Sequence, residues 1–143
     1  MTQPHKAQEY LKVRIETAKP TELLLLLLDG AVRFATQAKK HIEDQNFEEK
    51  NRLLLRSQEI LLELTQALDR KIGEELYGRL IGLYRFCYER LLEANVRNST
   101  RAVDEALTIL SHLRDTWRMA VERFEKSEEE NQRPQPKTLC VEG

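Results

Sequence analysis

The sequence predicts an all-α protein: an antiparallel up-and-down four-helix bundle with an additional short N-terminal helix and a disordered C-terminal tail. Glycine and proline are scarce, at 5 and 4 of 143 residues, whereas Leu, Glu, Arg, Lys and Ala dominate, as in helical proteins. Apolar residues also recur every three or four positions through four long stretches separated by short polar segments. We therefore expect an N-terminal segment over 1–19, the bundle over 20–124 and a disordered tail over 125–143.

The N-terminal segment fits two secondary structures. Ala7, Leu11 and Ile15 would line one face of a helix, whereas Leu11, Val13 and Ile15 alternate as they would in a strand. We expect a short, loosely attached helix. Because its apolar content is modest, this segment could cap an apolar groove of the bundle and be displaced by a binding partner.

The first helix of the bundle is expected from Pro20 to Glu43. Pro20 suits the first turn, where its missing N–H would have no partner, and Glu22 favours the positive end of the helix. Leu23 to Leu28 are six consecutive leucines, which make the helix apolar around its whole axis. One core needs only one apolar stripe, so this run leaves apolar surface for another contact. The expected core stripe is Leu24, Leu27 or Leu28, Ala31, Phe34, Ala38 and Ile42.

The second helix is expected from Phe47 to about Asp69, after a break in which Asp44 or Asn46 caps the new helix. The loop that follows, up to Gly73, is short, so the third helix must return antiparallel to the second. The core stripe of the second helix is Phe47, Leu54, Leu61, Leu64 and Leu68.

The third helix, from about Gly73 to Arg97, carries more apolar surface than one core requires. Its first apolar line is Leu76, Leu80, Leu83, Cys87, Leu91 and Ala94, and its second is Tyr77, Ile81, Tyr84 and Tyr88. Gly78 and Gly82 weaken this helix, and we expect them to permit close approach of a backbone within the bundle or from a bound peptide.

The fourth helix has the most regular apolar pattern. Asn98-Ser99-Thr100 supplies a capping signal at its start. The core stripe is Val103, Ala106, Leu110, Leu113, Trp117, Ala120 and Phe124. From Glu125 onward the sequence is rich in Glu and then contains proline, which is typical of a disordered tail.

The sequence shows no arrangement of residues for catalysis. It has no P-loop, no Gly-x-Ser-x-Gly motif and no Glu-x-x-His pair of the kind that builds a di-metal centre. His5, His41 and His112 are expected to be exposed to solvent. Cys87 lies on an apolar stripe without a neighbouring base and is expected to be an unreactive core residue. We therefore expect a protein that is not an enzyme and holds no metal or cofactor.

Charge and hydropathy limit the partners and the compartment. The formal net charge is -1, so no overall field favours nucleic acid. No segment approaches the ~20 apolar residues needed to cross a bilayer, and the N-terminus lacks the apolar run of a signal peptide. We expect a cytoplasmic protein with reduced cysteines, no nucleic-acid partner and no membrane insertion.

Several short motifs follow one another along the chain. They are Thr17-Ala18-Lys19-Pro20 with Glu22-Leu23, Leu28-Asp29-Gly30-Ala31, Gly73-Glu74-Glu75-Leu76, Leu83-Tyr84, Arg90-Leu91-Leu92-Glu93-Ala94-Asn95, and Leu113-Arg114-Asp115-Thr116-Trp117. In this order and spacing they resemble the FliS family, the flagellar secretion chaperones that bind flagellin. The resemblance covers about residues 7 to 122.

The resemblance implies a cytoplasmic export chaperone that binds the disordered C-terminal segment of flagellin, prevents premature polymerisation and assists delivery to the flagellar type III export gate. It implies a groove on the first and third helices of the bundle, and it matches Tyr10 to a tyrosine that acts at the export gate. The family usually has Ser where Lys19 stands, so a helix cap is expected to be lost. The expected partner-binding residues are Tyr10, Leu24, Leu27, Leu28, Ala31, Leu80, Ile81, Tyr84 and Tyr88.

Two other interpretations remain open at this point. The apolar stripes could pair between two copies, giving a structural helical homodimer with no export client; a chaperone without its client would instead be a monomer or a weak homodimer. An enzyme site could also be assembled from scattered residues such as Glu75, Arg79 and His112, which would require a concave pocket that gathers them.

Overall fold

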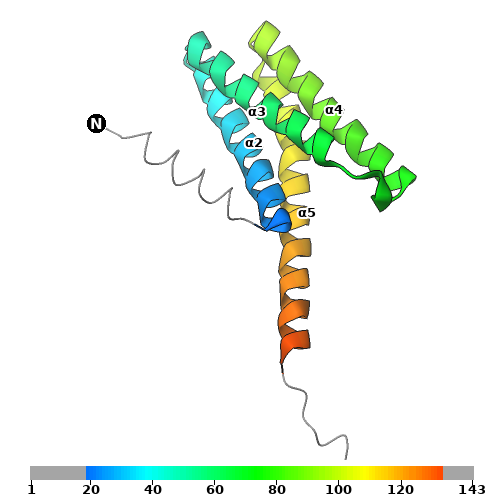
Figure 1. The fold of residues 1–143 in the computed structure, drawn as a ribbon. Helices are drawn as coiled ribbons and strands as arrows, with labels where there is room; N and C mark the ends of the chain where they lie inside the picture. Colours follow the sequence, from blue (N-terminus) through cyan, green and yellow to red (C-terminus); the bar gives the residue numbers. More distant parts are fainter. Residues whose placement is uncertain (1–18, 134–143) are drawn as a thin grey trace, which may run out of the picture.

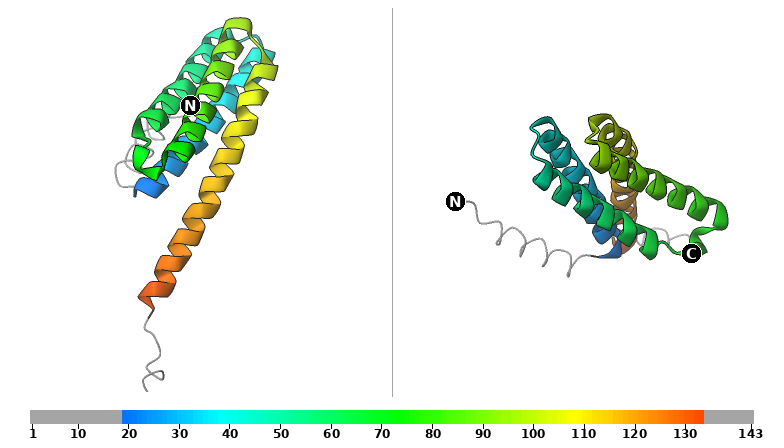
Figure 2. Two further views of the ribbon diagram at one scale, coloured as in Figure 1. Left: turned by 90° about the vertical axis from the view of Figure 1, so that its right-hand side faces the viewer. Right: turned by 90° about the horizontal axis from the view of Figure 1, so that it is seen from above.

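The computed structural model describes residues 19–133, which form a four-helix bundle. The elements are α2 (Pro20–Glu43), α3 (Phe47–Ala67), the short 3₁₀-helix η1 (Arg70–Ile72), α4 (Glu74–Arg97) and α5 (Thr100–Gln132). Successive helices run in opposite directions (Figures 1 and 2). Both α3 and α5 pack against α2 and against α4, so the helices close a ring. The predicted antiparallel up-and-down bundle is confirmed.

The starts of the helices follow from local chemistry. Pro20 occupies the first turn of α2 as predicted, and Lys19 before it makes no side-chain cap. Asn46 is the residue that precedes α3, but its side chain forms no cap hydrogen bond. The Ser99 hydroxyl accepts a hydrogen bond from the backbone N–H of Ala102 at 3.1 Å, which confirms the predicted cap of α5.

The core is one contiguous cluster to which all four long helices contribute. Most of the predicted stripe residues belong to it. The fully buried large side chains include Leu28, Leu54, Leu61, Leu91, Val103 and Leu110. Four predicted core residues at or near the ends of their stripes are instead exposed, namely Phe47 (44%), Leu76 (50%), Ala120 and Phe124 (57%), because neighbouring helices cover those ends less completely.

The end of the bundle that contains the α2–α3 and α4–α5 turns, here called the closed end, is joined by polar contacts. Lys50 of α3 is only 5% exposed, and its Nζ donates to the carbonyl oxygen of Asn95 at 2.9 Å and to Asn98 Oδ1 at 2.8 Å. Asn98 ends α4 in the left-handed conformation (φ 53°) that allows this contact. Midway along α2 and α3, buried Ser57 Oγ donates to the Ala31 carbonyl of α2 at 2.9 Å, whereas at the closed end itself Asn95 Nδ2 donates to Asn51 Oδ1 at 2.6 Å. The helices are therefore fastened to one another at this end.

The opposite end, here called the open end, lacks such packing. It comprises residues 20–27, 65–83 and 114–120, none of which is fully buried. The first turns of α4 lie well away from the first turns of α2 in Figure 1 and in the right-hand view of Figure 2. The bundle therefore has a closed end that is joined by buried polar contacts, although Phe47 there is 44% exposed, and an open end where apolar side chains remain partly accessible.

The last helix is longer than the sequence predicted. It does not end at Phe124 but continues to Gln132 and projects beyond the other helices (Figures 1 and 2). Glu, Lys and Arg have high helix propensity, and an existing helix extends without a new nucleation step. The expectation of a disordered tail is therefore wrong for residues 125–132, while residues 134–143, like residues 1–18 of the N-terminal segment, lie outside the described part of the chain.

Candidate functional site

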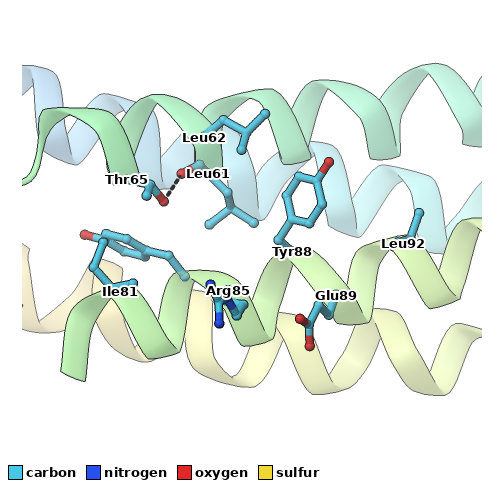
Figure 3. Close-up of a pocket in the computed structure, with 9 residues that line it drawn as sticks. Leu61, Leu62, Thr65, Ile81, Arg85, Tyr88, Glu89 and Leu92 are labelled. Atoms are coloured by element: carbon cyan, nitrogen blue, oxygen red, sulfur yellow. Dashed lines mark hydrogen bonds between the residues drawn. The ribbon is translucent and has the colours of Figure 1, made fainter. Parts of the chain in front are cut away.

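An apolar hollow of about 390 Å³ lies between α3 and α4 and is here called the α3/α4 groove (Figure 3). From α3, Leu61, Leu62 and Thr65 form one side. From α4, the groove is lined by Ile81, Tyr84, Arg85, Tyr88, Glu89 and Leu92. The hollow extends the partly accessible surface of the open end towards the middle of the bundle.

Helical spacing explains why these side chains lie together. Ile81, Tyr88 and Leu92 follow one another at seven and four positions along α4, so they share one side of that helix. Leu62 is 48% exposed and Leu92 47%, which leaves apolar surface open to solvent on both walls. Thr65 Oγ1 donates to the Leu61 carbonyl at 2.8 Å, and this satisfies its hydroxyl within α3 (Figure 3). The walls can therefore hold an apolar partner without leaving that hydroxyl unpaired.

Tyr84 forms part of the groove floor and is only 2% exposed. Burial raises the pKa of its phenol. Its role is therefore divided between the core and the groove.

A second hollow of about 320 Å³ lies on the other side of α3, against α2, and is here called the α2/α3 groove. Leu27, Phe34 and Ile60 give it an apolar base. The guanidinium groups of Arg33 and Arg56 lie 5.3 and 5.5 Å from the centre of the Phe34 ring. Such distances allow cation–π attraction, so this hollow is apolar below and charged at its rim.

The predicted binding residues divide among three places. Ile81, Tyr84 and Tyr88 line the α3/α4 groove, whereas Leu27 lines the α2/α3 groove. Leu24 and Leu80 are partly buried against the core. Leu28 and Ala31 are both 0% exposed, so in this structure they are core residues rather than groove residues. Tyr10 lies outside the described residues.

The predicted groove on α2 and α4 therefore differs from the structure. Helix α3 lies between these two helices, and each hollow is formed by α3 and one of its neighbours. Helical periodicity identifies which residues share a face but not which helices are adjacent.

The α3 side of the α3/α4 groove was missed in the sequence. Leu62 follows the core residue Leu61 directly and so points away from the predicted stripe. Leu55, which is seven positions earlier, is also exposed, at 47%. In the sequence, two leucines seven positions apart and outside the predicted core stripe could have indicated a second apolar face on this helix.

Cys87 is buried against α5, as the sequence predicted. It is 0% exposed, and its Sγ lies 3.8 Å from the carbonyl oxygen of Ala106. Burial raises the pKa of this thiol from its ordinary value of 9.0 to about 12. The thiol is therefore protonated at neutral pH and unsuited to nucleophilic chemistry.

The scattered residues considered for an enzyme site do not gather. Glu75 and Arg79 pair with one another at 2.9 Å on the surface of α4. Their side chains are 82% and 74% exposed, and the shallow hollow that they line does not include His112 of α5. Within residues 19–133, no three His, Cys, Asp or Glu side chains could hold a metal ion. His112 is exposed as predicted, whereas His41 is half-buried because it packs at the α2–α3 turn.

Within residues 19–133, none of the helices combines the length and the apolar character needed to span a bilayer.

Comparison with known proteins decides the family. The family model described as "Flagellar protein FliS" matches residues 1–123. The chain belongs to the FliS family. It is 34% identical to the flagellar secretion chaperone FliS of Bacillus subtilis over 117 residues, which are 82% of this chain and 86% of that protein. It is 33% identical to the flagellar secretion chaperone FliSB of Pseudomonas aeruginosa, over 77% of this chain and 87% of that protein.

The fold also has a counterpart among solved structures. A crystal structure of a flagellar chaperone from bacteria superposes with a TM-score of 0.68 at 22% identity, covering 83% of this chain and 97% of the other. Its fold is therefore the same. The curated relatives in the FliS family are named chaperones, not enzymes. Family membership supports a role for this chain as a flagellar export chaperone.

Proposed function

We propose that this chain is a cytoplasmic export chaperone that binds the disordered C-terminal segment of flagellin. It would prevent premature polymerisation and assist delivery to the flagellar type III export gate. The observation that carries this proposal is the apolar α3/α4 groove in a member of the FliS family. An amphipathic segment that folds into a helix in such a groove hides its apolar face without any chemistry.

The dimensions of the groove suit a short helix. Its lining on α4 extends from Ile81 to Leu92, which is about 16 Å at 1.5 Å per residue, or about three helical turns. A client side chain at every third or fourth position would reach between Leu62 and Tyr88. The groove is open to solvent, so it can accept a helix laid along it.

A client longer than one short helix has a second contact available. The α2/α3 groove lies on the other side of α3 and has its own apolar base around Phe34 and Ile60. Ordering a disordered segment costs several kcal/mol, so a long interface is needed to compensate for that cost. Two grooves on either side of one helix support an extended interface better than one pocket would.

The proposal is tested by placing a charge in the α3/α4 groove. Ile81→Asp and Leu62→Asp should each weaken binding of a flagellin C-terminal peptide at least about tenfold, because an unpaired carboxylate would be buried under the client. Isothermal titration calorimetry measures the affinity, and circular dichroism checks that the helices persist. Tyr84→Asp is unsuitable because Tyr84 is nearly fully buried.

Phe86→Asp provides the matched control. Phe86 lies on the same helix and is 41% exposed, but it does not line the groove. Its substitution should leave the affinity unchanged. Equal loss of binding in Ile81→Asp and Phe86→Asp, or no loss in either, would contradict the assignment of the groove.

Sedimentation of the client-free protein in the same buffer tests the prediction of a monomer or weak homodimer.

Two parts of the proposal concern residues outside the described range. We propose that residues 1–18 compete with the client for the groove, so their deletion should tighten peptide binding; weaker binding would make them part of the site. We also propose that Tyr10 acts at the export gate. Tyr10→Ala should then reduce flagellin secretion and leave the peptide affinity unchanged, and a reduced affinity would count against a separate role.

A further inference from the structure

Charged side chains line the α3/α4 groove on its α4 wall but not on its α3 wall. Its α3 wall, which consists of Leu61, Leu62 and Thr65, carries no charge. On the α4 wall, Arg85 and Glu89 are the charged side chains that line the hollow (Figure 3). A helix lying in the groove would therefore meet apolar atoms on one flank and two opposite charges on the other.

Arg85 and Glu89 differ from two similar pairs on the same helix. Glu75 and Arg79 are four residues apart and form an ion pair at 2.9 Å, and Glu93 and Arg97 do the same at 2.8 Å. No ion pair within 4.0 Å joins Arg85 to Glu89 or to another carboxylate of residues 19–133.

The order of the residues explains this difference. In the two pairs that form an ion pair, the acidic residue precedes the basic one, which is the favourable order at a spacing of four in a helix. Arg85 and Glu89 have the reverse order, so their mutual attraction within α4 is weaker. Both side chains are exposed and remain available to a partner.

We propose that Arg85 and Glu89 make the α3/α4 groove selective for an amphipathic helix carrying one acidic and one basic side chain four residues apart beside its apolar ridge. Residues four apart on a helix are separated by about 6 Å along its axis. A client helix lying along α4 therefore presents its two charges at the same separation as Arg85 and Glu89. This inference rests on the proposed function, because it assumes that the groove holds a client helix.

The test uses designed helical peptides, so that it does not depend on the client's sequence. All have leucines at positions i, i+4, i+7 and i+11, and they differ only at two flanking positions four apart, which carry Glu then Lys, Lys then Glu, two Lys, or two Glu. The full chain is compared with Arg85→Glu and Glu89→Arg by calorimetry. Both orders are needed, because only the order that places Glu beside Arg85 and Lys beside Glu89 is complementary to the α4 wall.

The unaltered groove should prefer one of the two mixed peptides, the one whose Glu lies beside Arg85 and whose Lys lies beside Glu89, by about two- to fivefold, which is the range of partly exposed ion pairs. Arg85→Glu should shift the preference to the peptide with two Lys, and Glu89→Arg to the peptide with two Glu. These preferences should diminish at 0.5 M NaCl, where screening shortens the range of the charges. Glu75→Arg, outside the groove, should keep the ranking of the unaltered chain.

The same ranking of peptides on all three proteins would overturn the inference. Measuring the flagellin C-terminal peptide alongside separates this result from the proposed function. If that peptide binds but the designed peptides show no charge preference, the charge selectivity alone is wrong. If the designed peptides are discriminated and the flagellin peptide does not bind, the groove is selective but the proposed client is wrong.

Discussion

The two ends of this bundle differ in how completely their apolar side chains are buried. At the closed end, Leu54, Leu91 and Leu110 are fully buried, and Lys50 joins α3 to the end of α4. At the open end, a run of leucines on α2 and the first turns of α4 remain partly accessible. The comparison shows that one end can supply the stability of the domain while the other keeps apolar surface available for a partner.

This division has a thermodynamic basis. Apolar burial is non-directional, and it is equally favourable within one chain and between two. A leucine already sealed in the core has no further surface to bury on binding, whereas Leu62 or Ile81 does. The ability to bind therefore requires that some apolar residues be incompletely covered, and the other end must compensate for that loss of stability.

The largest expected effect compares two leucines of α4. Leu91→Ala should lower the free energy of unfolding by about 2–5 kcal/mol, because Leu91 is 0% exposed and its loss leaves a cavity. Leu76→Ala, at the open end, should change it by less than about 0.5 kcal/mol, since Leu76 is 50% exposed. Urea denaturation followed by circular dichroism measures both. Equal effects on the free energy of unfolding would show that the two ends contribute equally to stability, contrary to what the burial of Leu91 and Leu76 indicates.

A smaller effect is expected at alkaline pH, where the thiol of Cys87 tests how well the core midway along α4 excludes water. Burial raises the folded-state pKa of Cys87 from 9.0 to about 12. The protonated thiol is therefore favoured in the folded state, and its contribution to stability is complete below pH 9 and is lost as the pH rises towards 12. Relative to Cys87→Ala, the unaltered chain should lose about 1–2 kcal/mol of unfolding free energy between pH 8 and 10.5.

The comparison with Cys87→Ala isolates this thiol, because every other titratable group is present in both proteins. Denaturation curves at several pH values provide the measurement. Parallel pH profiles for the two proteins would mean that the Cys87 thiol has an ordinary pKa and that water reaches the core around it.

The sequence predicted the closed end better than the open end. The stripe from Val103 to Leu113 on α5 corresponds to buried residues, because a regular spacing of three and four marks a helix with one covered face. The leucine run at the start of α2 is apolar all round, so periodicity could not tell its core face from its exposed face. Leu28 was consequently predicted both as a possible core residue and as a groove residue, and in the structure it is fully buried.

The position of the groove required knowledge of neighbouring helices. Leu62 and Tyr88 lie on helices that are adjacent in the bundle, and only packing brings them together. The resemblance to the FliS family indicated the function class, and the matching relatives confirm the family. The resemblance did not identify the α3 residues that line the groove, because the groove that it implied lay on α2 and α4.

The smallest expected effect concerns glycines. Gly78 and Gly82 were expected to permit close backbone approach, but a Cβ atom at either position would meet nothing within 4 Å in this structure. The close approach is instead at Gly30, where a Cβ would lie 3.2 Å from Ile60 Cδ1 across the α2–α3 contact. Replacing glycine by alanine is therefore expected to cause steric strain at Gly30 but not at Gly78 or Gly82.

Gly78→Ala and Gly82→Ala should each raise the free energy of unfolding by about 0.5–1 kcal/mol, because alanine restricts the unfolded chain and favours the helix. Gly30→Ala should gain less, since Ile60 must shift to make room. Thermal denaturation of the three variants measures the difference. If Gly30→Ala stabilised as much as Gly82→Ala, the α2–α3 contact would be more adaptable than its geometry indicates. If Gly82→Ala stabilised the protein but weakened peptide binding, the exposed glycine would serve a bound backbone and not the bundle.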